Sequence, residues 1–355
     1  MRTGGRGWWW GLLLLLVVVG ITAAYSLLRT GRLEPMAGAG TVLTGLVSDE
    51  VLPFVTDPEV RAILRERYDL ELCVSPAGPT EMVRRGAAEA DFLWGTGDWL
   101  VDTYRLTGGS LVRAEPVLQS PLVLYTWDQV AEALVREGLA ERHEAGYHSV
   151  EWAPLAEAIL AGGAWADWGV QEPVGPVEVV PPDPTQSGLG ALYVAHLVGA
   201  SQETLADVLP AVRGLLGNLG YLYPSSETLF GLYAEQGPGA LPLIVGQERQ
   251  MLAFLAAHPG EEAAIRGRLR VLYPRPTVWV RHPLLVLDER AVPLLAALGD
   301  DDVRRLAWAR YGYRAGAGAA EDPAALEAAG LPVTIEATAP PDAETMNRII
   351  LGLEQ

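Results

Sequence analysis

The stretch SLVRAEPVLQSPLVLYTW, Ser110–Trp127, is rich in apolar and β-branched residues and predicts a long extended chain, interrupted by Pro116 and Pro121. A second stretch of this kind, RLRVLYPRPTVWVRHPLLVL, lies at Arg268–Leu287. Around both stretches, predicted strands and helices alternate. A chain that builds one α/β unit, crosses to a second and crosses back has two links between them. Two lobes joined in this way can hinge about a cleft.

The alternation is clearest before the first long stretch. TVLTGLVS (Thr41–Ser48) predicts a strand, and TDPEVRAILRERY (Thr56–Tyr68) has a capping residue, an early proline and an apolar stripe, which predict a helix. Two more strands are expected at residues 70–76 and 90–96, with a helix between them. This order predicts an α/β fold in which two parallel-rich sheets with flanking helices are joined by two crossover strands. The expected lobes are residues 41–122 with 283–355, and residues 123–282.

The N-terminus carries an apolar segment, WWWGLLLLLVVVGITAAYSLL, at Trp8–Leu28. About 20 apolar residues cross a bilayer, and the preceding arginines and the tryptophans suit its interface. A secretory signal has a shorter apolar core and a small-residue cleavage site, for which TAA at residues 22–24 is weak. We therefore expect a transmembrane anchor, with a cleaved signal as the alternative. Residues 1–7 are then a cytoplasmic tail, residues 29–40 a linker, and the main domain is extracytoplasmic.

The composition and the motifs limit the classes of function that we expect for this chain. The formal net charge is −18, which argues against a nucleic-acid partner and against electrostatic adhesion to anionic lipid. The single cysteine, Cys73, excludes an intramolecular disulfide and is expected to be a small buried core residue. Histidines lack metal-ligand spacing, and the chain has no nucleophile elbow, Walker loop or dinucleotide fingerprint. We expect no cofactor, no metal and no enzymatic activity.

Hydroxyls, glycines and polar side chains recur where predicted strands end, which is where open α/β sheets bind ligands. The stretch DPTQSGLGALY, Asp183–Tyr193, leads from extended chain into a helix. Free N–H groups and the helix dipole there can bind an anion, although the same residues can simply cap the helix. The candidate ligand-binding residues are Ser48, Gly78, Thr80, Thr96, Asp98, Ser120, Asp183, Ser187, Gly188, Ser226, Gln247 and Glu248.

In their order along the chain, several segments resemble type II periplasmic solute-binding proteins, the substrate-capturing subunits of ABC importers. The resemblance covers nearly everything from Thr41 to about Arg314 and is carried by TGLVSDEVLPFVTDPEV, SPLVLYTW, DPTQSGLG, YPSSETLF, LYPRPTVWVRHPL and RRLAWARYGYR. It implies a ligand held between the lobes by loops at strand ends and helix N-termini. It also implies ABC permease subunits as partners, but it does not fix the ligand.

The favoured hypothesis is a membrane-tethered extracytoplasmic binder of a small polar ligand, most plausibly an oxyanion held by helix N-termini. Asp98, Asp183 and Glu248 would instead suit a cation or a polyol if their carboxylates pointed into the cleft. The alternative function is an anchored module of the same fold that serves a cell-surface assembly or a sensing role without transport.

Overall fold

The computed structural model describes residues 40–170, 175–201, 203–236, 241–315 and 322–354. All the helices and strands of the described residues belong to the unit Thr41–Gln355. The predicted anchor, Trp8–Leu28, lies outside the described residues. Within the described ranges, no helix is both long enough and apolar enough to span a membrane.

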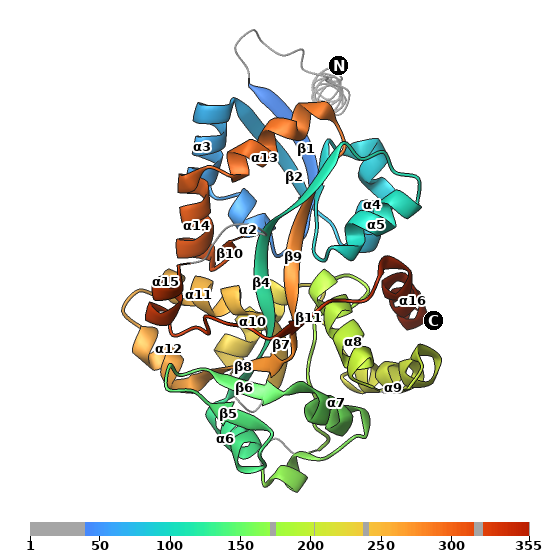
Figure 1. Ribbon diagram of the computed structural model, residues 1–355, viewed down its shortest axis with the longest axis vertical. Helices are drawn as coiled ribbons and strands as arrows, with labels where there is room; N and C mark the ends of the chain where they lie inside the picture. Colours follow the sequence, from blue (N-terminus) through green and yellow to red (C-terminus); the bar gives the residue numbers. More distant parts are fainter. Residues whose placement is uncertain (1–39, 171–174, 202, 237–240, 316–321, 355) are drawn as a thin grey trace, which may run out of the picture. The chain divides into compact units, whose positions relative to one another are not determined.

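The first strands form as predicted. Strand β1 (Thr41–Val47) pairs in parallel with β2 (Leu70–Pro76) on one side and with β3 (Phe92–Trp94) on the other. Helix α3 (Pro58–Tyr68) connects β1 to β2, and its N-cap is Asp57, whose side chain accepts hydrogen bonds from the N–H groups of Glu59 and Val60. Helix α4 (Pro79–Glu89) connects β2 to β3. Figure 1 shows α3 on one side of this sheet and α4 on the other.

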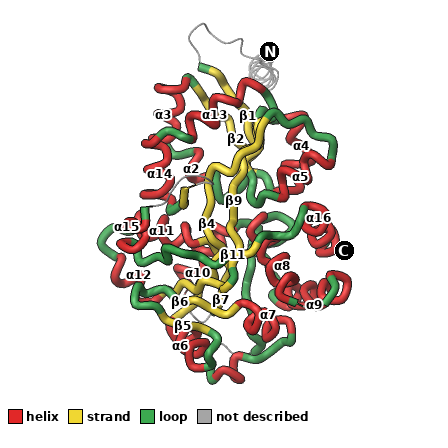
Figure 2. The backbone as a smooth tube through the Cα atoms, in the orientation of Figure 1, coloured by secondary structure: helices red, strands yellow, loops and turns green. Residues whose placement is uncertain are grey.

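The two long extended stretches run side by side through the middle of the sheet (Figures 1 and 2). The first is a single 15-residue strand, β4 (Arg113–Trp127). The second divides into β8 (Leu269–Arg275) and β9 (Thr277–Val286). Strand β4 pairs antiparallel with β9 up to Pro121, and beyond that point with β7 (Leu243–Gln247) and β8. Strands β4 and β9 thus form from the two stretches that were predicted to cross between the lobes.

Because β4 and β9 pair with each other, the two expected sheets are continuous. The strand order among the described residues is β2-β1-β3-β9-β4-β8-β6-β5. In addition, β7 and β10 pair with β4, and β11 pairs with β9. The remaining strands are β5 (Ala140–Arg142), β6 (His148–Glu151), β10 (Arg314–Ala315) and β11 (Ala337–Thr338). The outcome is a mixed α/β sheet in which the crossover strands pair antiparallel.

Helices cover both faces of this sheet. They are α2 (Leu52–Val55), α5 (Trp99–Leu106), α6 (Asp128–Arg136), α7 (Trp152–Leu160), α8 (Gly188–Ala200), α9 (Leu205–Asn218), α10 (Ser226–Gln236), α11 (Glu248–Ala257), α12 (Glu262–Arg268), α13 (Val292–Leu298), α14 (Asp301–Tyr311), α15 (Pro323–Ala328) and α16 (Ala343–Leu353). Several begin directly at a strand end, as α11 does after β7. These junctions position the candidate site.

The buried core consists of separate clusters on the two sides of the crossover strands β4 and β9. One buried cluster packs around β1 and includes Leu43 and Trp94. Two others lie around β7 and include Leu192 and Ile244. We call β1, β2, β3 and the elements that pack with them around the first cluster the β1 half. We call β7, α8 and the elements that pack with them around the other two clusters the β7 half. Helix α16 contributes Ile349 to the cluster around α8 and also contacts α5, so the predicted lobe limits stay a prediction.

Cys73 corrects one expectation. It was predicted to be buried, but it is exposed on β2. Among the described strands, β2 lies at the end of the sheet and pairs only with β1. Its alternation places Leu70 and Leu72 in the core, so the residue that follows Leu72 faces outward.

Candidate functional site

The turn after β1 meets the turn after β3. The backbone N–H of Ser48 donates to the carbonyl oxygen of Trp94 at 2.9 Å. The hydroxyl oxygen of Thr96 lies 3.1 Å from Ser48 Oγ and 3.0 Å from Glu50 Oε2. Glu50 and Thr96 are 1% and 0% exposed. Parallel strands therefore bring Ser48 and Thr96 together, and they add Glu50, which the sequence analysis did not select.

Residues of the β7 half touch this cluster directly. Ser187 caps α8, and its hydroxyl donates to Glu50 Oε1 at 3.4 Å. A Cβ on Gly188 would lie 2.7 Å from both the Cβ and the carbonyl oxygen of Thr96. Only glycine permits this approach, because real Cβ atoms stay farther from such neighbours. The predicted turn at Ser187–Gly188 thus lies against the β1 half.

Two further contacts join the halves. The backbone N–H of Ser226, at the start of α10, donates to Asp49 Oδ2 at 3.1 Å. A Cβ on Gly78 would lie 2.4 Å from the carbonyl oxygen of Gln186. The halves are therefore closed on each other at the ends of β1, β2 and β3 and at the beginnings of α8 and α10.

The end of β7 completes the network. Gln247 Oε1 lies 3.3 Å from Arg249 Nε and 3.2 Å from His282 Nε2. His282 Nδ1 lies 3.2 Å from Thr96 Oγ1. Gln247, Arg249 and His282 are all buried. A continuous hydrogen-bonded chain therefore runs from the β7 half to Glu50.

The chemistry of the partners orients these hydrogen bonds. Arginine has only donors, so the oxygen of Gln247 faces Arg249, and His282 must donate from Nε2. Burial lowers the pKa of His282 well below its usual value, so the ring is neutral and its Nδ1 accepts from the Thr96 hydroxyl. The same hydroxyl oxygen lies 3.0 Å from Glu50 Oε2, and a protonated Glu50 carboxyl would supply the hydrogen for that contact. Burial, and after it the neighbouring charge of Asp49, raises the pKa of Glu50 and supports this arrangement.

Charged and hydroxyl groups lie beside this chain. The guanidinium of Arg249 pairs with Glu227 and lies 4.8 Å from the centre of the Tyr313 ring. The backbone N–H of Arg249 donates to Ser120 Oγ at 3.1 Å, so Ser120 supports the start of α11. The site thus holds one buried cation close to the carboxyl groups.

Two polar atoms in the site have no partner. Among the described residues, Gln247 Nε2 and Ser226 Oγ are buried without a hydrogen bond. The orientation of Gln247 is fixed by Arg249, so its unpartnered atom is a donor. Buried polar groups in proteins are nearly always hydrogen-bonded, so an unpartnered pair calls for an explanation. Each of the two atoms is free to hydrogen-bond to an added acceptor.

Comparison with known proteins places the fold. No family model matches the sequence, and no curated protein matches it. Among solved structures, the chain is similar to the sulfate-binding protein SubI from Mycobacterium tuberculosis H37Rv, with 16% identity over 84% of this chain and 93% of that one and a TM-score of 0.54. It is similar to apo ferric ion-binding protein A from Pasteurella haemolytica, with 12% identity over 88% and 96% and a TM-score of 0.58.

A third similar structure is the substrate binding protein of the ABC transporter from Agrobacterium tumefaciens, with 14% identity over 90% of this chain and 94% of that one and a TM-score of 0.57. The chain has the fold of type II periplasmic solute-binding proteins. The resemblance predicted from the ordered segments is confirmed at the level of the fold. The similar structures are named as binding proteins, in agreement with the expectation of no enzymatic activity.

Three predicted acidic residues have partners within the chain. Asp98 pairs with Arg281 at 2.8 Å. Asp183 accepts from the backbone and hydroxyl of Thr185, at 2.9 and 2.7 Å, within its own turn. Glu248 is held by Arg314 at 2.6 Å and by the Tyr273 hydroxyl, also at 2.6 Å. Each of the three carboxylates thus has a partner within the chain, and whether any of them contacts a solute stays a prediction.

A groove opens beside the closed contact. Its volume is about 740 Å³, and residues of both halves line it, among them Asp49, Gly78, Thr80 and Gln186. A second groove of about 870 Å³ adjoins it along Thr185 and Gln186. The predicted residues Gly78 and Thr80 therefore lie at the rim of the contact, where a solute can approach.

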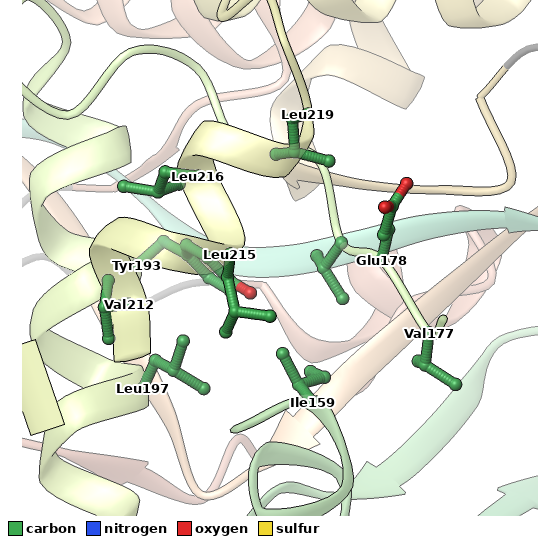
Figure 3. A pocket seen from close by; sticks show the side chains of 10 residues that line it. Ile159, Val177, Glu178, Tyr193, Leu197, Val212, Leu215, Leu216 and Leu219 are labelled. Atoms are coloured by element: carbon green, nitrogen blue, oxygen red, sulfur yellow. The ribbon is translucent and has the colours of Figure 1, made fainter. Parts of the chain in front are cut away.

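One other cavity is unsuited to a polar solute. It has a volume of about 20 Å³, room for about one water molecule, and lies between α8 and α9. Figure 3 shows that apolar side chains line it, including Ile159, Leu197 and Leu215, whereas the carboxylate of Glu178 points away from Ile159. This cavity is therefore not a candidate for a polar solute, whereas the grooves beside the contact between the halves are.

Sequence reasoning missed four residues of the network: Asp49, Glu50, Arg249 and His282. The signal for the first two was available, because they follow Ser48 at the same strand end. Arg249 likewise follows the predicted pair at 247–248. His282 lies within a crossover strand, and nothing in its neighbourhood in the sequence distinguishes it.

Proposed function

We propose that this chain is an extracytoplasmic solute-binding protein that captures a small polar solute, with an oxyanion as the favoured ligand, between its β1 and β7 halves. The observation that carries the proposal is the buried, unpartnered donor Gln247 Nε2, which lies in a network that spans both halves. The apolar segment Trp8–Leu28 supports a membrane tether. The fold supports import, with ABC permease subunits as partners.

Helix geometry favours an anion. The first N–H groups of α8 and α10 have no partners within their own helices, and each helix start carries a partial positive charge. The Gln247 amide and the Arg249 guanidinium add donors from the β7 end. Such a site stabilises an anion chiefly by dipoles, because the charge of Arg249 is already paired with Glu227. The net charge of −18 acts at long range and is screened over about 8–10 Å at physiological salt, whereas these donors act at contact.

The similar structures suggest two ligand classes, because one is named as sulfate-binding and another as ferric ion-binding. In the described part of this chain, no group of three His, Cys, Asp or Glu side chains could hold a metal ion. Donors rather than metal ligands remain unpartnered in the site. We therefore take a small tetrahedral oxyanion as the solute to test first.

Titration calorimetry of the full-length chain tests this function. The probes are sulfate, phosphate, molybdate, spermidine and a hexose, and the variants are Gln247→Leu, Ser187→Ala and the control Ser201→Ala at the other end of α8. We expect one oxyanion to bind the parent and the control. Gln247→Leu should bind it about 10- to 100-fold more weakly, because a hydrogen bond to a charged group is lost. Binding of spermidine or the hexose alone would contradict the oxyanion assignment.

A second function is favoured by the closed contact itself. Asp49 and Glu50 already bridge to the β7 half. A module that closes on its own side chains suits a role in a cell-surface assembly or in sensing, without transport. Purification of the full-length chain from native membranes distinguishes the two functions. Co-purification of permease and ATPase subunits supports import. Co-purification of other surface proteins without these subunits supports the assembly role.

A further inference from the structure

In the contact between the halves, the helix starts of the β7 half bind acceptor groups, as they would bind a ligand. These acceptor groups belong to the chain itself, because Asp49 and Glu50 of the β1 half supply them. On the basis of the proposed function, we propose that the turn Asp49–Glu50 is a built-in ligand. The carboxyl groups of Asp49 and Glu50 take the place of a ligand's acceptor oxygens at the starts of α10 and α8 and hold the halves closed without solute. An incoming oxyanion binds by displacing it.

Asp49 takes the donor that a bound anion would use. Its Oδ2 accepts at 3.1 Å from the N–H of Ser226, which lies 177 residues away in the other half. Helix α10 does not need this residue for a cap of its own, because Ser225 Oγ already accepts from the N–H of Thr228 at 3.3 Å. The carboxylate therefore adds a contact between the halves to a helix start that is capped locally.

Glu50 does the same at α8. Its Oε1 accepts from Ser187 Oγ at 3.4 Å, and its Oε2 lies 3.0 Å from Thr96 Oγ1. The side chain is 1% exposed, so the group is withdrawn from water into the contact. A buried carboxyl is tolerated because it is hydrogen-bonded on both oxygens. Two neighbouring residues of one turn thus reach two helix starts of the opposite half.

The built-in ligand leaves donors unsatisfied. With Asp49 and Glu50 in place, Gln247 Nε2 and Ser226 Oγ remain buried without partners. A tetrahedral oxyanion has acceptor oxygens on every side, so it can approach donors that this turn leaves unpaired. The turn is consequently a weaker match to the site than a free oxyanion, and a ligand of that class can replace it.

The test measures closure without any added solute. Spin labels are placed on the native, exposed Cys73 of β2 and on Gly214→Cys in α9, a position where nothing lies within 4 Å of a new Cβ. Pulsed electron paramagnetic resonance of the full-length chain then gives the distance between the halves. The variants are Asp49→Ala, Glu50→Ala and Glu50→Gln, with Glu71→Ala, an exposed acid on β2, as the control.

We expect one narrow distance distribution in the parent and in the control. Asp49→Ala and Glu50→Ala should raise a second, more open population at least about fivefold. Glu50→Gln should stay closed, because an amide donates to Thr96 and accepts from Ser187 as the protonated carboxyl does. Circular dichroism confirms that each variant is folded. If Glu50→Ala fails to fold, Asp49→Ala, at a half-buried position, decides the outcome.

Identical distance distributions in the parent and in Asp49→Ala would overturn the proposal, and so would a parent that is open without solute. A second arm measures sulfate and phosphate affinity. Removal of the competitor should tighten binding of the oxyanion in Asp49→Ala by at least about fivefold, and unchanged binding contradicts displacement. If no oxyanion binds any variant, the proposed function fails, whereas the distance measurement still decides whether the turn closes the protein.

Discussion

Gly188→Ala should hinder closure and leave each half intact. The added Cβ would lie 2.7 Å from the carbonyl oxygen and from the Cβ of Thr96, across the contact between the halves. Thr96 cannot easily move away, because its hydroxyl belongs to the buried network and the next residue, Gly97, donates its N–H to the carbonyl oxygen of Arg281 at 2.8 Å. The clash exists only in the state in which the halves touch.

The size of the effect follows from the cost of overpacking. An added methyl group in a close-packed contact costs about 1–3 kcal/mol. Applied to the closed state alone, this shifts the equilibrium toward the open state by about 5- to 140-fold. If solute binding requires closure, the dissociation constant rises by the same factor.

A control is available in the same helix. Gly199→Ala lies near the end of α8, where a Cβ would meet nothing within 4 Å. Alanine in place of glycine inside a helix stabilises it by about 0.5–1 kcal/mol, so this variant reports the helix effect without the clash. The distance between labels on Cys73 and Gly214→Cys is measured for both variants. Equal distances in Gly188→Ala and Gly199→Ala would refute the reasoning.

Three further predictions concern stability, measured by urea unfolding. Glu248→Leu removes the carboxylate that pairs with the buried Arg314 and should lower the free energy of unfolding by about 3–5 kcal/mol. The double variant with Arg314→Met should recover much of this loss. A loss below about 1 kcal/mol in Glu248→Leu would contradict the prediction. Burial lowers the pKa of His196 to about 4 in the folded protein. The stability that depends on the neutral ring is therefore present at a pH above the pKa of His196 in the unfolded chain, and it is lost as the pH falls toward 4. The parent should therefore lose roughly 3 kcal/mol more than His196→Gln between pH 7 and pH 4, and parallel losses would argue against it. Asp57 caps α3 and its carboxylate also pairs with Arg310, so Asp57→Ala should cost at least about 1–2 kcal/mol. Asp57→Asn keeps the cap and loses the ion pair, so its loss should be smaller, and equal losses in both variants would count against capping.

The local order of the fold could be predicted from the sequence. Runs such as Thr41–Ser48 are apolar and β-branched, and capping residues follow them, so strands, helices and their junctions are encoded within a few residues. The same pattern identified Ser48, Thr96, Ser187 and Gln247, which the structure brings into one network. The pairing of β4 with β9 was not predicted, because it joins residues far apart in the chain and makes the sheet continuous.

The direction in which each carboxylate points could not be predicted. Glu248 and Glu50 both follow a strand end, but Glu248 finds Arg314 66 residues later and Glu50 finds the other half. Local sequence does not reveal which distant partner a side chain will meet. Cys73 is a similar case, since its exposure depends on β2 lying at the end of the described sheet.

The central claim is that a small oxyanion binds between the halves and satisfies Gln247. Thermal unfolding of the full-length chain with sulfate, phosphate and molybdate, beside Gln247→Leu, tests it most directly. At about 100 times its dissociation constant, a ligand that binds only the native state adds about 2.7 kcal/mol to the free energy of unfolding. We predict this gain for one of the three oxyanions in the parent and a much smaller gain in Gln247→Leu. No stabilisation of the parent by any of them, or an equal gain in both proteins, would contradict the claim.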